Sequence, residues 1–255
     1  MHPLLFENGC YYIDRPAEFR SNGYLDMEDI IESLYFAYDM TFGEEGKHRN
    51  HRSGGSLKRH EGEIFADTFQ GKLAEYAFYN VFRNMHEIYL EKPDIRRMGL
   101  NKWDSCDFTV NGKEIAIKST KYFGNLLLLE TKDWDDKGRY VPNLNNDFCE
   151  YDYFVLIRVR PECSSIMKRN KWYYSDRLDF DELWPAITNE IWSANLVGYI
   201  TREELTETVI KTKQILPKNA NLNGTTRMDA ENYYVQAGDL NPLSNLIKTL
   251  QSIEK

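Results

Sequence analysis

The chain has 255 residues, with 42% hydrophobic and 14% aromatic side chains and a formal net charge of −8. This composition allows a sizeable core, and the sequence contains no internal repeat or low-complexity tract, so we expect a single domain over residues 1–255. The longest purely aliphatic run is Leu126–Leu129, and the first residues lack the basic and apolar regions of a secretory signal. We therefore expect a cytoplasmic protein with no membrane partner. The cysteines are scattered, which predicts reduced thiols rather than zinc pairs or disulfides: Cys10, Cys106, Cys149 and Cys163.

The N-terminal quarter contains one predicted helix and one basic segment. Apolar residues recur at helical spacing over 27–40. Residues 47–60 then hold five Lys or Arg and three of the five histidines, with no acid. A net acidic chain argues mildly against nucleic acid, but the local distribution of charge decides binding. We interpret this segment as a DNA-contacting loop; the alternative is a solvated loop, and zinc is not expected without a cysteine. Its candidate contacts are Lys47, Arg49, Arg52, Lys58 and Arg59.

A long helix is predicted over about residues 61–85, where apolar side chains again follow the helical period. Gly71 interrupts the pattern, which suggests a close approach of a sheet, and Glu75 falls on this helix. Residues 84–91 read as an edge strand.

Residues 104–120 predict a β-hairpin. Phe108 and Val110 alternate with polar residues, as in a strand, and Asn111-Gly112 is the strongest short signal for a type I′ turn. The return strand directs Glu114, Ala116 and Lys118 to one face. Asp107 can therefore meet Lys118 on one face of a sheet, at the end away from the turn.

The remaining chain alternates strands and helices. Residues 151–160 predict a central strand and 179–192 a helix, while Thr201 to Glu204 form a capping box that opens another helix. Residues 232–236 predict a strand and 241–253 a terminal helix.

Residues 217–236 have side chains suited to reading bases. Arginine can bind guanine in a bidentate manner, and asparagine and glutamine can bind adenine. Arg227, Asn232 and Gln236 are the candidates, although an ordinary polar loop and strand explains them equally well.

The stretch Asp107 to Thr120 resembles the PD-(D/E)xK nuclease superfamily, to which most type II restriction endonucleases belong. In that family an aspartate opens one strand, and a second carboxylate and a lysine lie one residue apart on the next. Gly71-Lys-Leu-Ala-Glu75 fits the helix that often precedes this hairpin. The resemblance covers roughly residues 62–160, and residues 1–61 and 161–255 are expected to add DNA contacts.

This chain departs from the pattern at Ala116, where the family has a carboxylate. A methyl group cannot bind Mg²⁺, which requires oxygen ligands. Glu114 could supply the oxygen, but it lies about 6–7 Å further along the strand. Alternatively, a carboxylate has been replaced to inactivate the enzyme, or the chain is a natural pseudo-nuclease. We favour replacement, because the rest of the pattern is intact.

The resemblance implies roles for individual residues. Mg²⁺, for which Mn²⁺ can substitute, would be bound by Asp107 and by the backbone carbonyl of Ile117. Glu114 would be the replacement ligand for the missing carboxylate. Lys118 would orient the attacking water or stabilise developing charge, and Glu75 would hold a metal-bound water. Ser119, Thr120 and Lys121, which follow, could contact phosphate.

We therefore expect an α/β (or α+β) fold with a central mixed β-sheet flanked by helices and a DNA cleft. The expected function is Mg²⁺-dependent cleavage of double-stranded DNA by a homodimeric type II restriction endonuclease of a restriction-modification system. The chain is inactive in that role if Ala116 abolishes metal binding. The alternatives are a catalytically silent DNA-binding protein with a nuclease fold, and an unrelated cytoplasmic enzyme or interaction protein.

Overall fold

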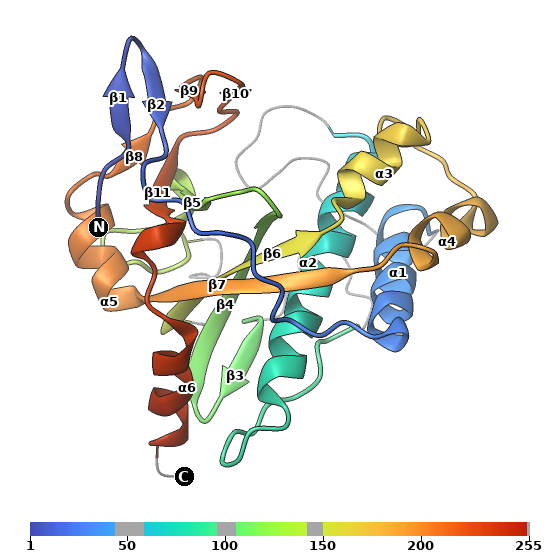
Figure 1. Ribbon diagram of the computed structural model, residues 1–255, viewed down its shortest axis with the longest axis horizontal. Helices are drawn as coiled ribbons and strands as arrows, with labels where there is room; N and C mark the ends of the chain where they lie inside the picture. The colour runs from blue at the N-terminus through green and yellow to red at the C-terminus, as the bar shows by residue number, and fades with distance from the viewer. Residues whose placement is uncertain (44–58, 96–105, 142–149, 254–255) are drawn as a thin grey trace.

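The computed structural model describes residues 1–43, 59–95, 106–141 and 150–253. It confirms a mixed α/β architecture with helices around mixed sheets (Figure 1). None of the helices in these ranges is long and apolar enough to cross a membrane.

The central sheet has the strand order β3-β4-β6-β7. Its strands are β3 (Phe108–Val110), β4 (Lys113–Lys121), β6 (Tyr153–Arg160) and β7 (Ser193–Thr201). β4 and β6 are parallel, while β3 and β7 run antiparallel to their neighbours. The strand predicted over residues 151–160 is therefore formed, and it pairs directly with the return strand of the hairpin.

Helices lie against one face of this sheet (Figure 1). α1 (Met27–Thr41) packs on the long α2 (Glu61–Phe82), with α3 (Cys163–Arg169) and α4 (Phe180–Thr188) beside them. Phe69 and Leu73 of α2 belong to the same fully buried cluster as Ile115 of β4 and Val155 of β6. The alternation of side chains along β4 thus sends its isoleucines towards α2.

The other face of the sheet is covered by a second, smaller sheet of order β5-β11-β8. It comprises β5 (Leu126–Glu130), β8 (Ile215–Leu216) and β11 (Asn232–Gln236). Ala116, Phe154 and Ile200 of the central sheet share a buried cluster with Leu127 and Val235 of this one. α5 (Arg202–Leu205) continues as a π-helical turn, Thr206–Ile210, and opens with the expected capping box at Thr201.

A third sheet and the last helix complete the fold. β1 (Leu5–Glu7), β2 (Cys10–Tyr12), β9 (Asn221–Leu222) and β10 (Thr226–Arg227) form a lobe beyond the end of the central sheet (Figure 1). α6 (Leu243–Gln251) packs on β7.

Two local expectations were wrong. Residues 84–91 form turns and irregular backbone rather than an edge strand, because the chain leaves α2 through a tight turn at Arg83–Met85. Gly71 is not needed for close approach, since a Cβ at this position would meet no atom within 4 Å.

Candidate active site

Asp107 and Ala116 lie opposite each other at the open end of the hairpin. Phe108 pairs with Ile115, Thr109 with Glu114 and Val110 with Lys113. Continuing this register by one residue places Asp107 across from Ala116, and directly opposed residues have Cβ atoms about 4.5–5.5 Å apart. Asn111 and Gly112 have φ values of 48° and 75°, as a type I′ turn requires, so the predicted turn fixes this register. A carboxylate at position 116 would therefore stand beside that of Asp107.

The Asp107 carboxylate is tied to β4. Its Oδ2 accepts a hydrogen bond from the backbone N–H of Ile117 at 2.6 Å. β3 has already ended as a paired strand at Phe108, so the side chain satisfies an amide that the ladder leaves open. This contact holds the Asp107 carboxylate beside Ala116 and Ile117, the two residues that precede Lys118 on β4.

Lys118 lies on the same face of β4 as Ala116, in an aromatic setting. Its Nζ is 5.8 Å from the ring centre of Trp134 and 5.8 Å from that of Tyr151. A cation over ring faces is attracted by their quadrupoles and is held in a restricted position. The side chain remains partly exposed, so the ammonium is fixed without being sealed from solvent.

The Glu114 carboxylate contacts Thr109, its partner across the hairpin. Thr109 Oγ1 lies 3.1 Å from Glu114 Oε1 and 3.0 Å from Oε2, across the hairpin. The backbone N–H of Glu114 donates to Asp152 Oδ2. These contacts do not bring the Glu114 carboxylate to Asp107, which weakens its candidacy as a replacement ligand.

Glu75 lies at the same level as Asp107 along the fold. Phe78 of α2 packs on Phe108, with ring centres 5.1 Å apart, and Asn111 donates to the carbonyl of Glu87, just beyond the end of α2. β3 therefore runs in the same direction as α2. Glu75 lies about one helical turn before Phe78, and Asp107 lies one residue before Phe108. Measured along its own element, each therefore lies about 3–5 Å before the contact between these two rings.

The Glu75 carboxylate already has a structural partner. Lys72 Nζ lies 2.6 Å from Glu75 Oε2, donates to the carbonyl of Asp94 at 2.9 Å and sits 4.7 Å from the ring centre of Phe36. The Lys72 side chain is 9% exposed and that of Glu75 is 19% exposed. This contact gives Glu75 a role in compensating a buried cation, separate from the expected catalytic role.

Ala116 is fully buried, and among the described residues no metal site is complete around it. It packs in the cluster that includes Trp134, Tyr151 and Phe154. Across the described ranges, no three His, Cys, Asp or Glu side chains come together as a metal-binding group. Of the carboxylates that the structure describes, that of Asp107 faces this position, where the resemblance implies a pair. The described donors therefore lack the second acidic ligand that the resemblance assigns to Mg²⁺.

The predicted phosphate contacts fall into three groups. Lys47, Arg49, Arg52 and Lys58 lie outside the residues that the structure describes. Arg59 pairs with Asp67, with 3.0 Å between Nη1 and Oδ2. Ser119 and Lys121, on β4, are exposed, and Thr120 is partly exposed.

Two of the predicted base readers are inside the protein. Gln236 is 0% exposed, and its amide contacts Asp14 and the backbone carbonyls of His2 and Pro3. Asn232 is 5% exposed and donates to the carbonyl of Ala230. The expectation that these side chains face DNA is corrected, because their polar groups are used to pin the N-terminal segment and a turn. Arg227 is exposed on β10.

Sequence reasoning missed the surroundings of Lys118 and Glu75. Trp134 and Tyr151 are distant from Lys118 in sequence, and no local pattern links them to it. Lys72 could have been found, because residues three apart on a helix are neighbours and carry opposite charges here. Comparison of the chain with protein-family models, with curated proteins and with solved structures found no match.

Proposed function

We propose that the chain has the framework of a PD-(D/E)xK endonuclease that acts on double-stranded DNA, and that hydrolysis requires a carboxylate at position 116. With Ala116 in place, the protein binds duplex DNA without cutting it. The observation that carries this proposal is the placement of Asp107 opposite Ala116, with Lys118 two residues further on the same face of β4.

The local geometry supports position 116 as the missing ligand. A glutamate or aspartate there would complete a pair of opposed carboxylates, and Mg²⁺ sites acting on phosphates are held by one or two carboxylates together with the phosphate. Lys118, held between Trp134 and Tyr151, is suited to stabilising negative charge on a scissile phosphate. Glu75 is not needed for this geometry, because α2 packs on the opposite face of β4 and the Glu75 carboxylate pairs with Lys72.

Restoring the carboxylate tests the proposal. We expect Ala116→Glu or Ala116→Asp to cleave plasmid DNA in the presence of Mg²⁺ or Mn²⁺, with EDTA abolishing cleavage. Ala116→Gln is the matched control, because it adds the same volume as glutamate without the charge. Asp107→Asn in the Ala116→Glu protein should remove the activity again.

The outcomes separate the competing functions. A folded Ala116→Glu protein that binds duplex DNA but does not cut it would support a catalytically silent DNA-binding protein, which the fully buried packing of Ala116 favours. Failure of the unmodified chain to bind any duplex at low salt would reject a DNA-related function altogether. A homodimer, which palindromic cleavage sites require, is checked by light scattering on the purified protein.

A further inference from the structure

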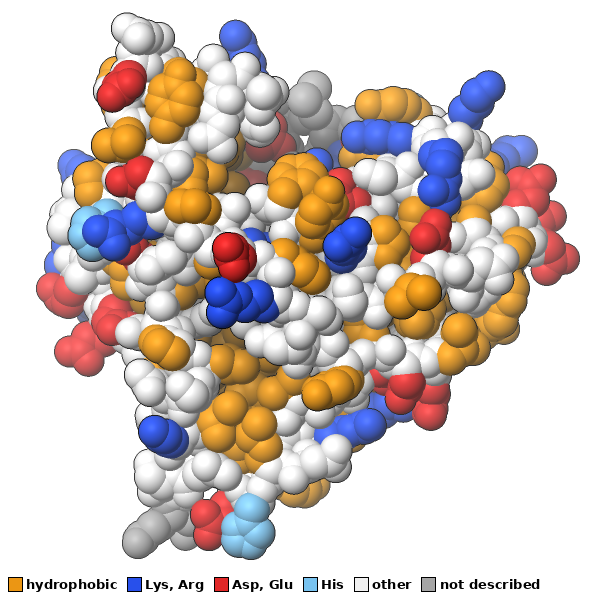
Figure 2. Space-filling view, in the orientation of Figure 1, with side chains coloured by type: hydrophobic (Ala, Val, Ile, Leu, Met, Phe, Trp, Pro, Cys, Tyr) orange, Lys and Arg blue, Asp and Glu red, His pale blue; other side chains and the backbone are white. Residues whose placement is uncertain are grey.

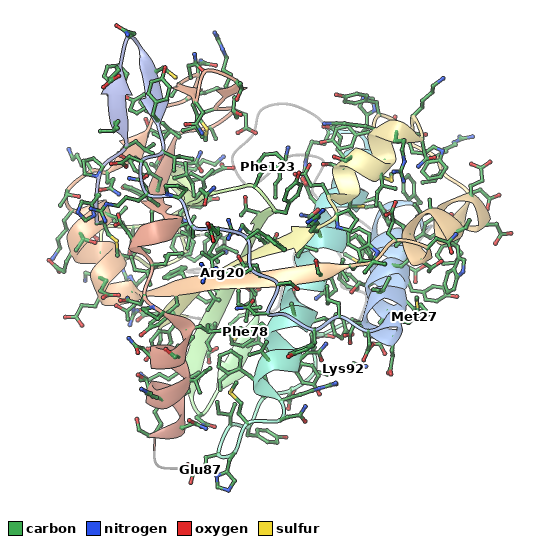
Figure 3. The ribbon with its side chains drawn as sticks, viewed as in Figure 1. Arg20, Met27, Phe78, Glu87, Lys92 and Phe123 are labelled. Carbon is green, nitrogen blue, oxygen red and sulfur yellow. The ribbon has the colours of Figure 1, made fainter. Side chains whose placement is uncertain are left out.

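Exposed aromatic rings gather where β4 ends. Phe123 is 59% exposed and Tyr122 is 38% exposed, and their ring centres lie 5.2 Å apart in an edge-to-face arrangement. Phe19, from the N-terminal segment, meets Tyr122 at 6.3 Å. We call these three residues the aromatic ridge. Figure 3 labels Phe123, and Figure 2 shows hydrophobic side chains beside Lys and Arg in the same region.

A cation accompanies each ring of the aromatic ridge. Lys121 Nζ is 5.6 Å from the ring centre of Phe123, and the guanidinium of Arg160 is 5.6 Å from that of Tyr122. The guanidinium of Arg158 is 5.6 Å from the ring centre of Phe19. Rings and cations thus alternate across the ends of β4 and β6.

Among the residues that the structure describes, these three cations have no acidic partner. Lys121, Arg158 and Arg160 form no ion pair with any residue that the structure describes. Nearby Glu18 pairs with Arg20, at 3.1 Å. Lys121 and Arg160 are exposed, and in a chain of net charge −8 two such neighbouring cations favour the approach of a polyanion to this surface.

Arg158 adds a permanent positive charge beneath the aromatic ridge. It is 1% exposed, and its guanidinium donates to neutral acceptors, including the carbonyls of Ala17 and Glu18 and the side chain of Asn195. Burial lowers the pKa of this guanidinium, but arginine still remains protonated at neutral pH. Beside it lies an open hollow of about 300 Å³, lined in part by Arg20 and Asn22.

The aromatic ridge continues the strand that carries the candidate active site. Lys121 is three residues beyond Lys118, or about 10 Å along β4. β3 pairs with β4 only over Lys113–Ile115, so no described strand covers that edge of β4 from Ile117 onwards. Residues three apart on a strand point to opposite faces, so a nucleic-acid strand that contacts both Lys118 and Lys121 would pass around this edge.

We propose that the aromatic ridge stacks unpaired nucleobases, so that the preferred nucleic acid has a single-stranded segment next to the site of Asp107 and Lys118. Every base has a π-face, and exposed rings interleaved with unpaired cations bind single strands by stacking and by phosphate contacts. The inference rests on the proposed function for the position of the duplex, but the stacking contact itself can be measured separately.

The test compares three labelled DNAs of one sequence by fluorescence anisotropy with the full chain: a single strand, a blunt duplex, and a duplex with a single-stranded overhang. Phe123→Ala should weaken binding of the single strand and the overhang duplex about tenfold and leave the blunt duplex within about twofold. Phe123→Trp should restore binding. Tyr89→Ala is the matched control, since Tyr89 is 70% exposed and lies in the segment that follows α2.

Charge variants provide a second measurement. Lys121→Gln should weaken single-strand binding and reduce its dependence on salt, whereas Lys248→Gln, on the exposed surface of α6, should do neither.

Unchanged single-strand binding by Phe123→Ala, with blunt-duplex binding intact, would overturn the ridge proposal and leave the proposed function standing. Equal weakening of all three DNAs would also overturn it, since stacking of unpaired bases would not be responsible. Absence of binding to every DNA would reject both proposals.

Discussion

The carboxylate of Asp107 accepts a hydrogen bond from the backbone amide of Ile117 at 2.6 Å and so joins the beginning of β3 to the middle of β4. This bond places the acid beside Ala116 and close to the strand that carries Lys118. The same contact would position Asp107 for a metal if position 116 carried an acid, and it is independent of any catalytic role. Its contribution to stability can therefore be measured in the present protein.

Asp107→Ala should destabilise the fold by about 1–2 kcal/mol, because the amide of the nearly buried Ile117 loses its acceptor. Asp107→Asn should cost less, since its side-chain oxygen can still accept. Urea unfolding followed by circular dichroism measures both. Equal stability of the alanine and asparagine variants would show that loss of this hydrogen bond does not cause the destabilisation.

Lys118→Ala, made in the Ala116→Glu protein, should reduce cleavage at least about a hundredfold, because the ammonium acts on charge that develops during the reaction. Duplex affinity should change less than about threefold. Lys118→Met, which keeps the packing between Trp134 and Tyr151, should be as inactive as the alanine variant. Cleavage rates and binding isotherms are compared; equal loss of cleavage and binding would contradict the assigned role.

Glu75→Ala should destabilise the protein by about 2–3 kcal/mol, because it removes the carboxylate that compensates the buried ammonium of Lys72. The double variant Glu75→Ala with Lys72→Met should recover much of that loss, since the buried ammonium is removed as well. Thermal unfolding of the unmodified protein, Glu75→Ala, Lys72→Met and the double variant gives the coupling. Additive losses would mean that the two side chains do not stabilise each other.

The buried carboxyl group of Asp29 should make the stability of the fold decrease as pH rises through the acidic range. Burial is the largest influence on this carboxyl and raises its pKa, outweighing hydrogen bonds from the Asp26 amide and Asn80 that lower it. Because the folded pKa lies above the unfolded value, the folded state holds the proton more tightly. The stabilisation is full below the unfolded pKa and is lost as pH rises through the folded pKa.

Asp29→Asn keeps an acceptor for the Asp26 amide and for Asn80 but cannot ionise. We expect its stability to change less than that of the unmodified protein as pH rises from the unfolded pKa of an aspartate through neutrality. Denaturant midpoints across this range test the expectation. Identical pH profiles would show that another group controls stability there.

Local chemistry made the hairpin predictable. Asn111-Gly112 accepts the positive φ values that the turn requires, and the alternation of Phe108, Val110, Ile115 and Ile117 permits one register against α2. The opposition of Asp107 and position 116 follows from that register. The capping box at Thr201 was predictable for the same reason, since its partners lie within one helical turn.

The polar side chains of β11 could not be assigned from sequence. Asn232 and Gln236 have the chemistry of base readers, but both are buried because β11 lies between β5 and β8 and because the N-terminal segment crosses the end of that sheet. The partners of Gln236 lie more than two hundred residues away in the sequence. No local pattern therefore distinguishes its buried amide from an exposed one.

The sequence by itself determined the hairpin, its turn and the spacing of Asp107, Ala116 and Lys118, because turn geometry and the two-residue period of a strand depend on neighbouring residues. Only the tertiary structure decided that Trp134 and Tyr151 flank Lys118, that Lys72 is buried against Phe36 and the carbonyl of Asp94, and that Phe19 joins Tyr122 and Phe123 in one ridge. These contacts arise where separate elements pack together, and packing is set by the burial of the whole core rather than by any one segment.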